Sequence, residues 1–365
     1  YNSFVLPNAP EDREGYRFLG YSLTEGSDSA QYQAGDVVVT TGNVTVYEVW
    51  EFIDTHLVTI TFPVSLGLPD QQIPALDGED LDRSEISLPE GFTLKDLMLD
   101  GASFSGPISS DLTLTAEVGL VAPSMGSSVI VESEGYTTIS FQADHVRDDV
   151  LILYYLHTEN ANGGVVEVSH NVTGSFVITE EGDYAIWATA YLNSDLSIYS
   201  SDVNCNFLNV NVNEPPQDVY HIEQDGDSAQ AVISGDTAVF TSSDTHSNVN
   251  LDITFSDVTE ISLSGTTRYG TLSVSAVSIP EASIPASLTE GTVGIDVSVN
   301  NIPEYTMEIA FVIEVPSGYL LSGATAVFLN ENGELDDASY RIDGNIVYVI
   351  TDHNTPYYVT PTFTE

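Results

Sequence analysis

The sequence has 365 residues with 55 acidic and 7 basic side chains, so its net charge is −48, and its length corresponds to two to four domains. A chain this acidic is not expected to bind nucleic acid or an anionic membrane through a basic patch. Hydrophobic residues make up 42% of the chain in strand-sized runs, so we expect packed cores and no membrane-spanning segment.

Lysine is nearly absent from the chain, because Lys95 is the only one and the remaining basic residues are arginines. A surface of this kind repels itself and needs surrounding cations, as in a salt-adapted cytoplasm or outside a cell. Abundant Ser, Thr, Asn and Tyr favour the exterior. The single cysteine, Cys205, excludes an intrachain disulfide and a cysteine-based zinc site. We therefore predict an extracellular, cell-surface protein of a prokaryote.

Strand-like patterns recur along the whole chain. β-Branched and aromatic residues alternate with polar ones, for example at residues 44–47, 59–62 and 345–349. Only two short helices are predicted, near Gly91–Leu97 and Ser283–Leu288. The predicted fold class is all-β, with tandem small β-grasp-like repeats followed by an Ig-like domain and another β-sandwich.

Residues 1–53 carry the most specific motif. Its parts are Leu6-Pro7-Asn8-Ala9-Pro10, Arg13-Glu14-Gly15-Tyr16, Phe18-Leu19-Gly20-Tyr21, Tyr32, Ala34-Gly35-Asp36 and Val46-Tyr47-Glu48-Val49-Trp50. Together they resemble the Listeria–Bacteroides repeat, or internalin-type B-repeat, a small β-grasp-like module of bacterial and archaeal surface proteins. This chain has Tyr21 where the family usually has Trp. We expect Phe18, Tyr21 and Trp50 to form the core of the module.

A second, diverged copy of this module is predicted over residues 54–122. Its Glu90-Gly91-Phe92 matches Glu14-Gly15-Tyr16 of the first copy. It also has an opening strand at residues 57–64 that the first copy lacks. Either the strand was removed at a fragment boundary or another chain supplies it. An open edge of this kind is a template for strand addition, although natural edges are usually protected.

Residues 127–213 are predicted to form an Ig-like β-sandwich. Glu181-Gly182-Asp183-Tyr184 opens a strand and resembles a tyrosine corner, in which the ring hydroxyl bonds to nearby backbone. Asn213-Glu214-Pro215-Pro216 is a predicted linker, because Pro-Pro cannot continue a ladder. We expect Cys205 to be a packed thiol, since no histidine lies near it in sequence.

Residues 217–365 form the last predicted module, a C-terminal β-sandwich. Glu331-Asn332-Gly333-Glu334 is a hairpin signal. Thr351-Asp352-His353 followed by Pro356-Tyr357-Tyr358 resembles β-sandwich domains near the C-terminus of prokaryotic surface proteins. His353 is expected to fix the turn before the final strand, because no partner base or nucleophile can be named for catalysis.

The sequence offers no catalytic motif, so we predict no enzyme, no catalytic residue and no cofactor. The histidines lack metal-site spacing, and the frequent carboxylate pairs arise by chance among 55 acids. The acidic loops at residues 77–82, 225–227 and 330–337 suit calcium by their oxygen content. None has EF-hand spacing, so solvated turns are the simpler interpretation and the metal ligands stay unassigned.

Two sequons predict N-glycosylation, at Asn43 and at Asn171. Chance occurrence in a chain rich in Asn and Thr explains them equally well.

The sequence as a whole predicts a non-enzymatic structural protein of the cell surface. It would be a stalk, filament or surface-layer component whose modules are beads on short linkers. Its partners would be copies of itself or other surface proteins. One alternative is an adhesin or glycan-binding module, which an exposed Tyr or Trp platform in a cleft would favour. Another is the non-catalytic tail of a secreted enzyme.

Overall fold

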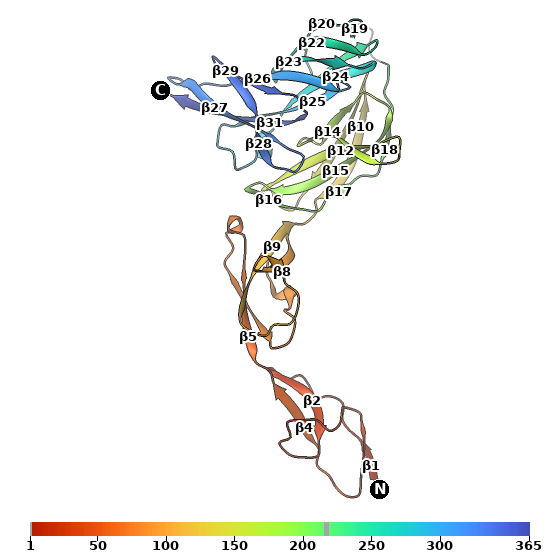
Figure 1. The fold of residues 1–365 in the computed structure, drawn as a ribbon, viewed down its shortest axis with the longest axis vertical. Coiled ribbons are helices and arrows are strands. Elements are labelled where there is room, and N and C mark those ends of the chain that lie inside the picture. Colours follow the sequence, from red (N-terminus) through yellow and green to blue (C-terminus); the bar gives the residue numbers. More distant parts are fainter. Residues whose placement is uncertain (1, 215–218) are drawn as a thin grey trace. The chain divides into compact units, whose positions relative to one another are not determined.

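The computed structural model describes residues 2–214 and 219–365, and in this part of the chain the only helical segments are three short 3-10 turns (Figure 1). The prediction of an all-β fold is therefore confirmed. The chain divides into two compact units, residues 1–89 with 93–118, and residues 90–92 with 119–365. Pro215 and Pro216 of the predicted linker lie outside the described residues.

The first module of the first unit consists of two small antiparallel sheets. One pairs β2 (Tyr16–Ser22) with β4 (Tyr47–Phe52), and the other pairs β1 (Asn2–Val5) with β3 (Val37–Thr40). No other strand of the described chain pairs with β4. Its second edge therefore remains open, as expected for a copy without the opening strand.

Of the three aromatic residues predicted to form the core of this module, Tyr21 is a core residue and Phe18 packs against that core, while Trp50 is partly exposed and lies outside it. Tyr21 is buried, and its hydroxyl donates a hydrogen bond to the carbonyl oxygen of Asn8 at 2.9 Å. The ring centroid of Phe18 lies 5.2 Å from those of both Tyr21 and Trp50. Gly20 follows a bulge at Leu19 and has φ +132°, where a Cβ would lie 2.3 Å from a backbone oxygen, so only glycine fits.

The second module is a five-stranded sheet in the order β6-β5-β9-β7-β8. The predicted opening strand is present as β5, which pairs in parallel with β9. The bounds are Thr55–Thr61 for β5, Gln71–Leu76 for β6, Phe92–Leu99 for β7, Ala102–Ser103 for β8 and Leu112–Leu120 for β9. Turns η1 (Val64–Leu66) and η2 (Arg83–Glu85) lie between strands.

The helix predicted near Gly91–Leu97 is wrong, because these residues begin strand β7. Gly91 adopts φ +87°, as Gly15 adopts φ +76° before β2. Each glycine therefore makes the turn into a strand, at matching places in the two copies. Leu97 is fully buried in β7.

Strands β10 to β18 form a two-sheet sandwich. One sheet has the order β10-β11-β14, and the other has the order β13-β12-β15-β16, with β17 and β18 also paired to β15. The bounds are Ser124–Glu132, Thr137–Asp144, Val150–Glu159, Val165–Asn171, Ser175–Ile178, Gly182–Leu192, Asp195–Tyr199, Val203–Asn204 and Leu208–Val210, in order from β10 to β18. We call this part the first sandwich.

The hydrogen bond of the predicted tyrosine corner is present in the first sandwich. The hydroxyl of Tyr184 donates to the carbonyl oxygen of Glu180, four residues upstream, at 3.1 Å. Burial, and then the charge of Glu180, raise the pKa of Tyr184 to about 12. The hydroxyl therefore stays protonated at physiological pH and remains a donor.

We expect Tyr184→Phe to lower the free energy of unfolding by about 1 kcal/mol, the net contribution of one such hydrogen bond. The ring would stay packed in the core, so the fold would be retained. Urea unfolding of the two proteins measures the difference. Equal unfolding midpoints would show that this bond contributes nothing.

Strands β19 to β31 form the second sandwich, with sheet orders β19-β21-β24-β25-β31-β27-β28 and β20-β22-β23-β26-β30-β29. Phe240, Phe255, Phe311 and Tyr357 fill the core between the two sheets. The bounds are Tyr220–Ile222, Ser228–Ile233, Thr237–Ser242, His246–Phe255, Thr259–Thr267, Gly270–Ser278, Val293–Asn300, Glu304–Val312, Leu320–Leu329, Leu335–Asp337, Ser339–Asp343, Ile346–Thr351 and Thr355–Thr364, from β19 to β31.

Two local predictions in the second sandwich have opposite outcomes. The hairpin at Glu331–Glu334 is confirmed, because it joins the antiparallel strands β27 and β28. The helix at Ser283–Leu288 is wrong, and only the turn η3 (Glu281–Ser283) forms. Ile284 precedes Pro285 and is extended, since proline disfavours the helical conformation of the residue before it.

The two sandwiches are packed together, so the expectation of beads on short linkers is wrong for this part of the chain. A shared apolar cluster joins the outer face of the β12 and β15 sheet to the outer face of the β27 and β31 sheet. The second unit thus contains four β-sheets, with one apolar cluster inside each sandwich and another between the two sandwiches.

Candidate functional site

The contact between the two sandwiches, which we call the sandwich interface, is the most distinctive feature of the second unit. Leu151, Leu153 and Tyr155 project from one face of β12. They pack with Leu329 of β27 and Tyr358 of β31, which are both completely buried. Side chains of this size each contribute on the order of 1.5–3 kcal/mol when buried, so apolar burial is a large favourable term in this contact.

A pair of tyrosines links the interface to the β27–β28 hairpin. The hydroxyls of Tyr155 and Tyr191 lie 3.0 Å apart, and that of Tyr155 donates to the carbonyl oxygen of Glu331 at 3.1 Å. Gly333, at φ +76°, touches the ring of Tyr191 so closely that a Cβ would lie 2.4 Å from it. Burial raises the pKa of both tyrosines, so the hydroxyls stay neutral.

His170 of β13 bonds to both sandwiches. Its Nδ1 lies 2.9 Å from a carboxylate oxygen of Glu167, and its Nε2 lies 3.2 Å from the carbonyl oxygen of Leu329. Both partners are acceptors, which favours the doubly protonated ring. Burial acts to lower the pKa of His170, but the bonds to Glu167 and Leu329 outweigh it and the pKa is raised overall.

Asp296 of β25 is a buried acid in the same interface. One carboxyl oxygen accepts a hydrogen bond from the backbone N–H of Val172 at 3.2 Å. Burial raises the pKa of Asp296 to about 7, against the opposing effects of that hydrogen bond and of the nearby His170. The hydroxyl of Tyr358 is buried close by and has no hydrogen-bond partner among the described residues.

These polar groups fix how the sandwiches dock. His170 and Val172 belong to the first sandwich, while Leu329 and Asp296 belong to the second, so each bond holds only in one relative position. Buried hydrogen bonds of this kind specify a unique packing. This set of residues contains no nucleophile with an adjacent base. Its hydrogen bonds hold the two sandwiches together.

The sequence analysis missed this interface, although a signal was present. Residues 150–156, Val-Leu-Ile-Leu-Tyr-Tyr-Leu, form a continuous apolar run in place of an alternating one. Such a run marks a strand covered on both faces. The run lies in β12, with Leu151 on the sandwich interface and Leu156 in the core of the first sandwich.

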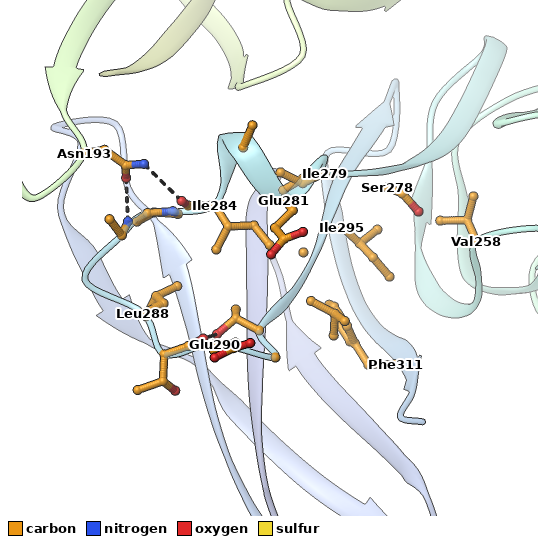
Figure 2. A pocket seen from close by; sticks show the side chains of 18 of the residues that line it. Asn193, Val258, Ser278, Ile279, Glu281, Ile284, Leu288, Glu290, Ile295 and Phe311 are labelled. Atoms are coloured by element: carbon orange, nitrogen blue, oxygen red, sulfur yellow. Dashed lines mark hydrogen bonds between the residues drawn. The ribbon is translucent and has the colours of Figure 1, made fainter. Parts of the chain in front are cut away.

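A cavity of about 800 Å³ lies under the loop of residues 279–292 in the second sandwich (Figure 2). Figure 2 shows Asn193 of the first sandwich bridging to this loop, with bonds to the carbonyl oxygen of Ile284 and the N–H of Ala286. Glu281 and Glu290 are its charged lining residues, and none of the described lining residues is Tyr, Trp, His or Cys. Phe311 is the one aromatic lining residue given for this cavity, which therefore has no Tyr or Trp platform of the kind expected of a glycan site.

The two predicted glycosylation sites differ in accessibility. Asn43 and the rest of its sequon are exposed before β4. Asn171 is buried, with its amide donating to the carbonyl oxygen of Ser175 and accepting from the N–H of Gly174. Of these two asparagines, only Asn43 is exposed and could accept a glycan in the folded chain.

The predicted acidic loops use many of their oxygen atoms internally. Asp77 pairs with His56, and Asp227 accepts bonds from the N–H groups of Glu223 and Gln224. The side chain of Asn330 caps its own hairpin loop. Within the residues that the structure describes, no group of three or more His, Cys, Asp or Glu side chains is placed to hold a metal ion.

Two further residues singled out in the sequence have structural contacts. His353 lies in the β30–β31 turn, where its Nδ1 is 3.2 Å from the hydroxyl of Thr351 and its carbonyl accepts from Tyr357, as its predicted turn-fixing role requires. The thiol of Cys205 is partly buried against the first core and accepts a bond from the N–H of Ile186.

Comparison of this chain with family models, with curated proteins and with solved structures found no match. The resemblance of residues 6–51 to a B-repeat therefore stays a prediction. Among the described residues, no helix has the length and apolar character needed to cross a membrane.

Proposed function

We propose that this chain is a non-enzymatic structural protein of the outer cell surface. It would serve as a stalk, filament or surface-layer component and associate through its β-modules. The observation that carries the proposal is the sandwich interface, in which buried tyrosines, His170 and Asp296 are committed to holding two domains in one arrangement. A unit of two sandwiches held together in this way suits a mechanical role.

Charge supports the same location. A net charge of −48 with one lysine suits a surface bathed in cations, which screen the repulsion between neighbouring molecules. The B-repeat-like motif of residues 6–51 adds to this argument, because modules of that kind are expected on cell surfaces.

Immunogold labelling of native cells tests the location directly. We expect an antibody against the folded chain to label intact cells as strongly as permeabilised ones. Labelling that requires permeabilisation would rule out a surface role. Negative-stain microscopy of the native protein, with and without calcium, then separates an ordered filament or layer from a dispersed stalk.

The native protein is also expected to carry any N-linked glycan at Asn43 and none at Asn171. The first amide is exposed, whereas the second is buried and bonded on both sides. Mass spectrometry of peptides from the native protein measures both occupancies, with the Asn171 peptide as the internal control. A glycan on Asn171 would contradict this expectation.

A further inference from the structure

A groove of about 780 Å³ lies between the two modules of the first unit. The first module contributes the turn Arg13–Tyr16 and the start of β2. The second module contributes Thr55, residues 74–76 at the end of β6, and Glu79. We call this feature the module groove. Its volume falls within the range of small-ligand sites, roughly 300–1,000 Å³.

Part of the module groove is aromatic and apolar. Tyr16 is partly exposed, and the guanidinium carbon of Arg13 lies 4.0 Å from the centroid of its ring. Phe52 contacts the same ring edge-on, at 5.4 Å between centroids. Pro74 and Leu76 add aliphatic surface from the second module. A held aromatic ring beside aliphatic side chains suits the apolar face of a sugar ring.

Charged groups of both signs line the same groove. Two of the seven basic residues of the chain, Arg13 and Arg17, are among its lining residues. The acidic lining residues are Asp12, Glu14 and Glu79. Guanidinium groups only donate hydrogen bonds, and ionised carboxylates only accept them. A hydroxyl does both, so a ligand with several neighbouring hydroxyls can bond to both kinds of group at once.

The donors of Arg13 are not used by an ion pair. Four arginines of the described chain pair with carboxylates, namely Arg17, Arg83, Arg147 and Arg341. Arg13 and Arg268 form no ion pair among the described residues. Stacking on Tyr16 orients the plane of the Arg13 guanidinium and leaves its N–H groups able to donate at the edge of that plane. Arg17 contacts Glu79 only at 3.5 Å between exposed side chains, a contact that contributes little and that a ligand can replace.

Charge selects a neutral ligand for this groove. The lining carries three carboxylates and two guanidinium groups, in a chain of net charge −48. An acidic ligand would be repelled by the lining carboxylates and by the molecule as a whole. A cationic ligand would meet the two guanidinium groups and leave their donors unused.

Two other cavities lack this combination of groups. The cavity under the loop of residues 279–292 has neither a tyrosine nor an arginine among its lining residues. A cavity of about 280 Å³ beside Arg268 includes Tyr184, but that ring is packed in the core of the first sandwich. The module groove therefore has the arrangement that best fits a polyhydroxylated ligand.

From these observations we propose that the module groove binds a neutral saccharide. A sugar ring packs its apolar face beside Tyr16, while its hydroxyls accept from Arg13 and Arg17 and donate to the lining carboxylates. This inference goes beyond the proposed structural role, because it gives the first unit a ligand of its own.

An array of neutral oligosaccharides, with sialylated and uronate-containing ones beside them, tests the ligand class on the full chain. We expect binding to neutral members that changes little between low and high salt, because a neutral ligand has no charge for salt to screen. Binding confined to acidic members, or to no member at all, overturns the inference. Binding to an array of uncharged peptides in place of the saccharides overturns it as well.

Calorimetric titration with the array member that binds best then tests the groove itself. Arg13→Ala and Tyr16→Ala are each expected to weaken binding at least tenfold. The matched controls are Arg268→Ala, at the other arginine without an ion pair, and Tyr269→Ala, at a tyrosine that is 77% exposed. Both controls should bind as the wild type does.

Two variants separate loss of the site from loss of the fold. Tyr16→Phe keeps the ring and should keep most of the binding, and Arg13→Ala changes an exposed side chain that is not needed for packing. Wild-type binding by both Arg13→Ala and Tyr16→Ala, or equal weakening by the controls, overturns the inference. Surface labelling of cells is unaffected by these results, so failure of this site and failure of the surface role are separable.

Discussion

Between pH 5 and pH 8 the second unit is expected to lose about 3 kcal/mol of its free energy of unfolding, and Asp296→Asn should remove most of that loss. The folded protein holds the pKa of Asp296 at about 7 by burial, whereas an unfolded aspartate ionises near pH 4. The folded state therefore binds a proton that the unfolded state has released. Stability falls as the pH rises towards 7 and then levels off.

His170 acts in the same direction. Its pKa is raised in the folded state, so its contribution is complete below the ordinary value for histidine and is lost as the pH rises through the folded value. Glu167 bonds to His170, and Tyr358 lies near Asp296, so these are the titratable groups beside the pair.

Tryptophan fluorescence during urea unfolding provides the measurement. The chain has two tryptophans, and Trp50→Phe leaves only Trp187, which packs at the sandwich interface. Asp227→Asn is the matched control, because bonds from the N–H groups of Glu223 and Gln224 lower the pKa of Asp227 and move its titration below the window. A pH-independent wild-type midpoint, or an unchanged slope in Asp296→Asn, would contradict the prediction.

Gly333→Ala is expected to destabilise the same unit by about 2–4 kcal/mol, through overpacking together with left-handed backbone strain. The added Cβ would lie 2.4 Å from the ring of Tyr191. That ring cannot easily retreat, because its hydroxyl is bonded to Tyr155 and Tyr155 is bonded to the hairpin itself. The clash should therefore loosen the docking of the hairpin.

Gly344→Ala separates the steric effect from the backbone effect. Gly344 has φ +63°, close to that of Gly333, but nothing lies within 4 Å of its added Cβ. This variant should lose only about 1 kcal/mol, the cost of the left-handed conformation. Urea unfolding followed at Trp187 compares the two. Equal losses would show that the hairpin yields without strain and does not fix the interface.

Local sequence rules predicted those parts of the fold that depend on local chemistry. The turn at Glu331–Glu334 and the hydroxyl bond of Tyr184 each involve residues only a few positions apart. The two helix predictions failed because short apolar patterns do not distinguish a helical turn from a strand. Pairing within the sheet makes β7 a strand, and a proline prevents a helix at Ser283–Leu288.

The sandwich interface could not be predicted in the same way. His170 and Leu329 are 159 positions apart, and Val172 and Asp296 are 124 apart. No local pattern pairs a histidine with a carbonyl on another domain. The run at residues 150–156 does indicate a strand buried on both faces, but it does not predict which part of the chain packs on the second face. The glycosylation site predicted at Asn171 is buried for a related reason. A sequon can be read from the sequence, but its burial depends on the fold.

The central position of β31 has a consequence for how the chain folds. Thr355–Thr364 is the last strand in chain order, yet it pairs with β25 on one side and β27 on the other. Its sheet cannot close until these residues have been synthesised, and until then Leu151, Leu153 and Tyr155 lack Tyr358 as their cover. Pairings over such sequence separations form slowly and leave apolar surface exposed to aggregation meanwhile. Completion of the second unit should therefore be the slow step of folding. Until then, the outer face of β12 in the first sandwich should remain exposed to solvent.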